Sequence, residues 1–135
     1  MTTSLERARQ QYLEQQVASA SPARLVTMLY DRLLVDIDRA VAAQDGGDPV
    51  GAGSHLTHAQ SIVAELSGSL TDVWDGAEDL RALYTYLTGR LIVANVTRDR
   101  AAAAECREIV EPLREAWHEA AAALTPSPAA APAFA

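Results

Sequence analysis

Apolar residues recur at intervals of three and four along four separate stretches of this 135-residue chain. This spacing places them on one side of an α-helix, so the pattern predicts four amphipathic helices. Glycine, proline and aspartate separate the stretches, as expected where helices begin and end. The predicted helices cover about residues 22–44, 49–67, 76–97 and 100–123.

The first predicted helix is apolar over an unusually wide part of its surface. Ser21 can cap its N-terminus, and Pro22 suits the first helical position. Two neighbouring apolar rows follow, and they consist of Leu25, Leu29, Leu33, Ile37 and Ala40, and of Val26, Tyr30, Leu34 and Val41. A helix of this kind either lies centrally in a bundle or keeps part of its surface for a partner.

Each of the other three helices has one main apolar row. The inward-facing residues are expected to be Ala52, Leu56, Ala59, Val63 and Leu66, then Leu80, Leu83 or Tyr84, Leu87, Leu91 and Ala94, and finally Ala102, Cys106, Ile109, Leu113, Trp117, Ala120 and Leu124. Asp99 is a candidate cap for the last helix. Pro112 lies inside that helix and predicts a kink near residues 108–112.

The lengths of the segments predict how these helices assemble. Short connections favour antiparallel neighbours, so residues 19–124 are expected to form one all-α domain, an antiparallel up-down-up-down four-helix bundle. Residues 1–18 carry only scattered apolar residues and predict a loosely docked N-terminal arm. Residues 125–135 are rich in proline and alanine and predict a disordered tail.

Composition excludes several functional classes. The net charge is −7 and every basic residue is arginine, without a basic run, so a nucleic-acid partner is not expected. No apolar run is long enough to span a membrane, and the N-terminus lacks the pattern of a secretory signal, which predicts a cytoplasmic protein. The single cysteine, Cys106, lies in an apolar row and is expected in the core.

Two residue pairs that contain histidine are the strongest candidates for metal ligands. Glu115 and His118 match the Glu-x-x-His element of di-iron bundles, but such sites need two copies and this chain has one. His55 and His58 share a helix face, but no further ligand follows at helical spacing. We therefore expect no metal and no other cofactor, and an exposed, solvated Glu115–His118 pair.

Three aspartates in the first helix resemble a carboxylate cluster. Arg32 and Arg39 interleave with Asp31, Asp36 and Asp38, which predicts an exposed, charge-balanced helix face. The chain also has no glycine-rich phosphate loop and no nucleophile elbow. The sequence therefore predicts a protein that is not an enzyme.

Two blocks of residues carry a family resemblance. The first consists of Tyr12, Val17, Ser19, Ala20, Ser21, Pro22, Leu25, Met28, Leu29, Tyr30 and Asp31, and the second of Leu83, Tyr84, Tyr86, Leu87, Leu91, Ala94 and Asn95. Together with the ending at residues 113–117, they resemble the FliS family of flagellar secretion chaperones over about residues 12–119.

The resemblance implies a function and partners. It implies a cytosolic chaperone that binds the disordered C-terminal segment of flagellin, prevents premature polymerisation and delivers the subunit to the flagellar type III export apparatus. The export gate and flagellar regulators are further candidate partners. The alternative interpretation is a non-catalytic helical adaptor or a homodimerising bundle.

A helical bundle binds such a segment by accepting its apolar face in a groove. Tyrosines suit a groove because each combines an apolar ring with a polar tip, although packing at the rim of the core explains them equally well. The candidate groove residues are Tyr12, Val17, Val26, Tyr30, Leu34, Tyr84, Tyr86, Leu87, Leu91 and Asn95. The N-terminal arm, through Tyr12 and Val17, is a candidate cover for the empty groove.

Overall fold

The computed structural model describes residue 7, residues 22–70 and residues 75–124. All the regular structure within these residues is helical, which confirms the predicted fold class. The helices are α2 (Pro22–Asp45), α3 (Pro49–Gly68), α4 (Ala77–Val96) and α5 (Arg100–Leu124). Their ends differ from the predicted ones by at most one residue, and the predicted arm and tail lie outside the described residues.

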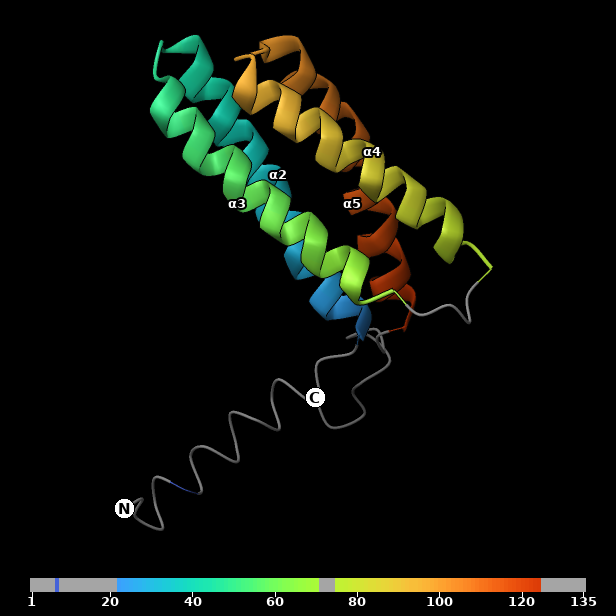
Figure 1. Ribbon diagram of the computed structural model, residues 1–135. Coiled ribbons are helices and arrows are strands. Elements are labelled where there is room, and N and C mark those ends of the chain that lie inside the picture. The colour runs from blue at the N-terminus through green and yellow to red at the C-terminus, as the bar shows by residue number, and fades with distance from the viewer. Residues whose placement is uncertain (1–6, 8–21, 71–74, 125–135) are drawn as a thin grey trace.

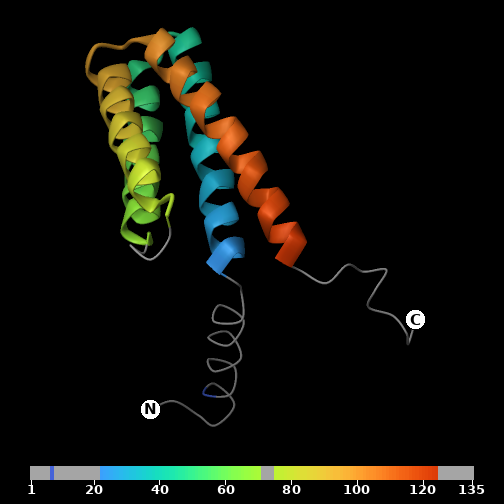
Figure 2. The ribbon, with the colours of Figure 1, turned by 90° about the vertical axis from the view of Figure 1, so that its right-hand side faces the viewer.

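The helices form an antiparallel bundle in which neighbours in sequence pack side by side (Figure 1). α2 packs against both α3 and α5, and α4 closes the bundle by packing against α3 and α5. Figure 2 shows α3 and α4 on one side and α2 and α5 on the other. Short connections between antiparallel helices produce this arrangement.

Aspartate and glycine set the helix ends at two of the turns. The Asp48 carboxylate accepts a hydrogen bond from the Gly51 backbone N–H at 2.9 Å, which caps α3. Just before it, Gly47 has a φ of 71°, a conformation that favours glycine. Asp99 caps α5 as predicted, because its carboxylate accepts a hydrogen bond from the Ala102 N–H at 3.2 Å.

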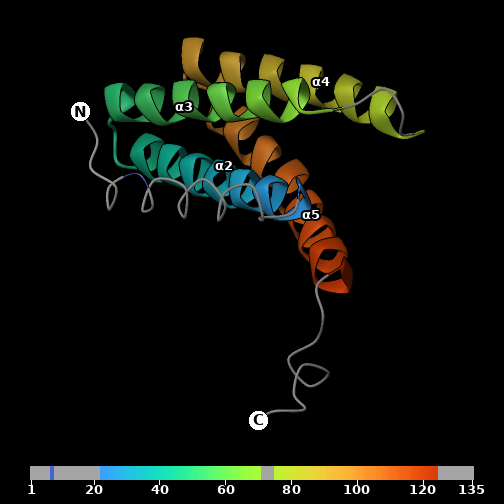
Figure 3. The same ribbon diagram turned by 90° about the horizontal axis from the view of Figure 1, so that it is seen from below.

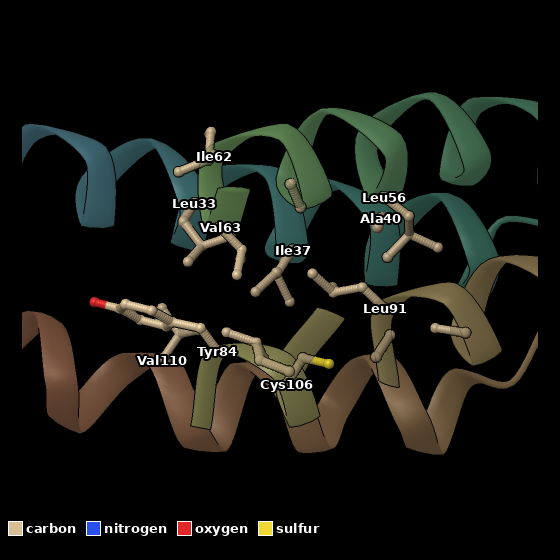
Figure 4. Close-up of a cluster of buried hydrophobic side chains, with 14 of the residues drawn as sticks. Leu33, Ile37, Ala40, Leu56, Ile62, Val63, Tyr84, Leu91, Cys106 and Val110 are labelled. Atoms are coloured by element: carbon tan, nitrogen blue, oxygen red, sulfur yellow. The ribbon is translucent and has the colours of Figure 1, made fainter. Parts of the chain in front are cut away.

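The core lies where apolar rows from all four helices meet (Figure 4). Leu33 and Ile37 of α2 face Leu91 of α4 and Val110 of α5 across this core. Cys106 is also buried, as predicted, and burial raises the pKa of its thiol to about 12. The thiol therefore stays protonated at neutral pH and packs as a small apolar side chain.

α5 is packed unevenly along its length. The helix runs unbroken through Pro112, but no described residue beyond Val110 is fully buried. Its C-terminal end diverges from α3 and α4 (Figures 2 and 3). The prediction that Ala120 faces inward is wrong, because Ala120 is exposed on this diverging part. The predicted kink at Pro112 stays a prediction.

None of the helices among the described residues combines the length and apolar character needed to cross a membrane.

Candidate protein-binding surface

The structure distributes the predicted groove residues between the core and the surface. Four of them are buried, and these are Tyr30, Tyr84, Leu87 and Leu91. Three are partly exposed, and these are Val26, Leu34 and Asn95. Tyr86 is half exposed. Tyr12 and Val17 lie outside the described residues.

The two buried tyrosines connect helices that lie diagonally across the bundle. The Tyr30 hydroxyl of α2 and the Tyr84 hydroxyl of α4 are hydrogen-bonded at 2.6 Å. The Trp117 ring of α5 stacks beside Tyr30, with ring centroids 6.4 Å apart and an interplanar angle of 21°. Burial raises the pKa of both tyrosines, so both hydroxyls stay protonated and available as donors. In the unbound chain the rings of Tyr30, Tyr84 and Trp117 therefore pack together and join three helices.

Tyr86 lies on the surface between α4 and α5. Its hydroxyl donates a hydrogen bond to the Glu105 carboxylate, which also accepts one from Arg90 Nε at 2.8 Å. The hydrogen bond to Glu105 raises the pKa of Tyr86. The polar tip is thereby held while the ring stays half exposed and can contact a partner.

A row of exposed apolar residues lies on α2. Leu25, Met28 and Val35 are 41%, 53% and 39% exposed. Arg32 and Arg39 are exposed at the intervening positions. We call these five residues the α2 seam.

Leu25 begins the first apolar row predicted for this helix, but it is exposed, whereas Leu33 and Ile37 of the same row are buried. Successive helical residues are rotated by about 100°, so Leu25 lies some 40° from Leu29, on the solvent side of the row. Two family-motif residues, Leu25 and Met28, are therefore surface residues, while Leu29 is partly buried. Ser21 lies outside the described residues, and Pro22 begins α2.

Asp36 contradicts the prediction of an exposed aspartate cluster, because its side chain is fully buried. His58 of α3 hydrogen-bonds one of its carboxylate oxygens through Nδ1. Arg32 Nε lies 3.2 Å from the other oxygen, one helical turn away on α2. A buried charge requires partners of this kind. The carboxylate is thus an anchor beneath the α2 seam.

Asp31 joins α2 to α5. Its carboxylate accepts hydrogen bonds from Arg114 Nε and His118 Nε2, both at 2.6 Å. Burial alone would raise the pKa of Asp31, but these two hydrogen bonds outweigh it and hold the pKa below its usual value. Glu115 is exposed as expected, and the His118 side chain stays 41% exposed while it hydrogen-bonds Asp31.

No group of three histidine, cysteine or acidic side chains that could hold a metal ion occurs within the described residues. A hollow of about 620 Å³ lies over the end of α3, lined by small and polar residues, among them Ser61, Ala64 and Gly68. The predicted groove residues do not line it. The described surface does offer exposed apolar side chains for binding.

A helical bundle with large apolar side chains exposed on its helix faces has the features of a protein-binding module. Comparison with known proteins is more specific. The model of the family "Flagellar protein FliS" matches residues 5–124 of this chain. The chain belongs to the FliS family, and it is an export chaperone of the flagellum with a flagellar protein as its partner.

Individual relatives agree with this assignment. The flagellar secretion chaperone FliS of Bacillus subtilis is 32% identical over 109 residues, covering 81% of this chain and 82% of the relative. The Escherichia coli protein of the same name is 34% identical over 110 residues, covering 79% and 81%. A crystal structure of a bacterial flagellar chaperone superposes with a TM-score of 0.69 at 17% identity, covering 84% of this chain and 94% of the other, which shows a shared fold.

Proposed function

We propose that this chain is a cytosolic chaperone that binds the C-terminal segment of flagellin, keeps that segment from polymerising and delivers the subunit to the type III export apparatus. Family membership supports the proposal, since the relatives are named flagellar secretion chaperones. The export gate and flagellar regulators are proposed as further partners of the loaded chaperone.

The observation that carries the proposal is the apolar surface left exposed on two helices. Leu25, Met28 and Val35 of α2 form one group, and Ile92 and Val96 of α4 form another. Exposed large apolar side chains that gather along helix faces are typical of surfaces that bind a partner. Because the two groups lie on different helices, an extended partner that wraps the bundle fits them better than one compact domain.

The energetics also favour an extended partner. Folding a disordered segment on binding costs about 2–5 kcal/mol or more. Burying about 1,500 Å² of apolar surface at about 25 cal/mol per Å² contributes roughly 37 kcal/mol before the costs of association and ordering. A wrapped segment therefore has enough surface to offset its ordering, and a short peptide has less of it.

A capture experiment tests the proposal. The tagged chaperone is mixed with intact flagellin of the same organism and, separately, with flagellin that lacks its C-terminal segment. We expect capture of the intact protein alone, and sedimentation should show a one-to-one complex. Equal capture of both proteins, or of neither, would contradict the proposed function.

A further inference from the structure

The α2 seam has the spacing of a helix-packing surface. Its residues Leu25, Met28, Arg32, Val35 and Arg39 follow one another at steps of three, four, three and four. Sustained alternation of this kind forms a straight row along a helix, and a second helix packs on such a row. All five residues are exposed, and the row is about 21 Å long at 1.5 Å per residue.

The charge of the α2 seam is opposite to that of the whole chain. The chain has a net charge of −7, yet the seam contains two arginines and no acidic residue. Arg32 and Arg39 are seven residues apart, so they lie on the same side of α2, two turns from each other. A helix that packs on the seam would meet apolar side chains and these two cations.

The two arginines of the seam differ in their surroundings, and both can bind a carboxylate of a partner. Arg32 is held from below by the buried Asp36, with Nε 3.2 Å from the carboxylate, while half of the Arg32 side chain stays exposed. A guanidinium has five N–H donors, so this contact leaves others for a second carboxylate. Arg39 is exposed and has no ion pair with any residue that the structure describes.

We propose that the α2 seam binds one amphipathic helix of the flagellin segment. Apolar side chains of that helix pack on Leu25, Met28 and Val35, and two of its acidic side chains, about seven residues apart, pair with Arg32 and Arg39. This inference rests on the proposed function. Charge complementarity favours a helix with such acidic side chains over the chain's own N-terminal arm. The charged residues of that arm are Glu6, Arg7, Arg9 and Glu14, which sum to zero.

The acidic pairing gives the docked helix a register. Apolar contacts along a heptad row allow a helix to slide by one turn, whereas two charges at fixed spacing favour one position. A second copy of this chain fits less well. Its exposed α5 residues Glu108, Glu115 and Glu119 are acidic, but that face has only alanines and Pro112 to cover Met28 and Val35.

Binding measurements with the full-length chain and a labelled C-terminal flagellin peptide test the proposal. Arg39→Glu should weaken binding about tenfold at low salt, and the loss should shrink at about 0.5 M salt because ions screen exposed charges. Met28→Ala should weaken binding about tenfold at both salt concentrations, since it removes apolar contact.

Matched controls separate a local effect from a general one. Arg98→Glu makes the same charge change at an exposed turn, and Val50→Ala truncates an apolar residue that is 83% exposed at the start of α3. Both should bind as the unaltered chain does, and all four variants should melt at its temperature. One acidic residue of the peptide, changed to arginine, should restore binding to the Arg39→Glu chain and not to the Arg98→Glu chain.

The possible failures are distinguishable. Peptide binding that Arg39→Glu and Met28→Ala leave unchanged would overturn the seam proposal and leave the proposed function intact. Tighter binding by Met28→Ala would show that the chain's own arm occupies the seam, and a dimer that Arg39→Glu converts to a monomer would assign the seam to a second copy. Either result overturns the seam proposal. If the unaltered chain does not bind flagellin, both the seam proposal and the proposed function are overturned.

Discussion

Two polar contacts inside this bundle join different helices. Tyr30 bonds Tyr84, and Asp36 bonds His58. A buried polar atom that loses its partner is more costly than a pair that is removed together. These contacts therefore specify how the helices meet, beyond what apolar packing alone would specify.

The tyrosine pair gives a prediction with an internal check. Tyr84→Phe should reduce the free energy of unfolding by about 1 kcal/mol, because the Tyr30 hydroxyl keeps its hydrogen bond with Trp117. Tyr30→Phe should cost about 2 kcal/mol, because it leaves both Tyr84 and Trp117 without this partner. The double variant should cost less than the two single changes added. Urea denaturation measures all three, and strictly additive costs would show that the hydroxyls do not interact.

Asp31 predicts a dependence of stability on pH. Its pKa is lowered from 3.8 in the folded chain, so its contribution is present above the unfolded pKa and is lost as the pH falls through the folded one. Asp31→Asn should therefore cost up to about 1 kcal/mol at pH 7 and much less at about pH 3, since exposed ion pairs contribute little. Denaturation at both pH values measures the difference. Glu108→Gln on the exposed side of α5 is the control, and an equal pH response in both variants would refute the assignment.

Two glycines inside helices make opposite predictions at the scale of the element. A methyl group at Gly89 of α4 would meet nothing within 4 Å, so Gly89→Ala should add about 1 kcal/mol to the free energy of unfolding through helix propensity. At Gly53 of α3 the same methyl would lie 2.9 Å from Asn95 Oδ1, so Asn95 must move and the gain should be smaller. Thermal denaturation compares the two, and an equal gain would mean that Asn95 moves freely.

Helix positions follow from the sequence because the signals that set them are local. Asp48 and Asp99 cap helices whose periodic rows begin just after them, and Gly47 supplies the conformation that the first turn requires. These residues act through backbone groups at most three positions away. Such contacts are encoded in the order of residues along the chain.

The binding surface is harder to predict from the sequence, because its exposure depends on contacts between residues that are far apart along the chain. Periodicity places Leu25 beside Leu29, but the packing of α3 and α5 around α2 decides which of them is covered. Asp36 is buried, and its hydrogen-bond partner is His58, 22 residues later. His118 meets Asp31 across 87 residues. Sequence spacing within one helix contains none of this information.

At the scale of the whole molecule, burial of the described residues is uneven, because α5 is buried in its first half and not at its end. Ala102, Cys106 and Val110 are fully buried in the first half of α5, and no described residue is fully buried after them. Pro112 has no N–H, so the α5 ladder also lacks one hydrogen bond at this point. Local opening is easiest where few apolar contacts must be broken.

Amide hydrogen exchange should therefore divide α5 in two. Backbone amides at residues 113–123 should exchange through local fraying, faster than those at residues 104–110, which need opening of the core. Replacing Pro112 with alanine restores the missing donor but not the missing burial, so it should slow exchange around residue 112 and leave the end of the helix fast. Uniform protection along α5 would mean that contacts outside the described residues hold its end. Slow exchange throughout in the alanine variant would instead assign the loose end to Pro112 alone.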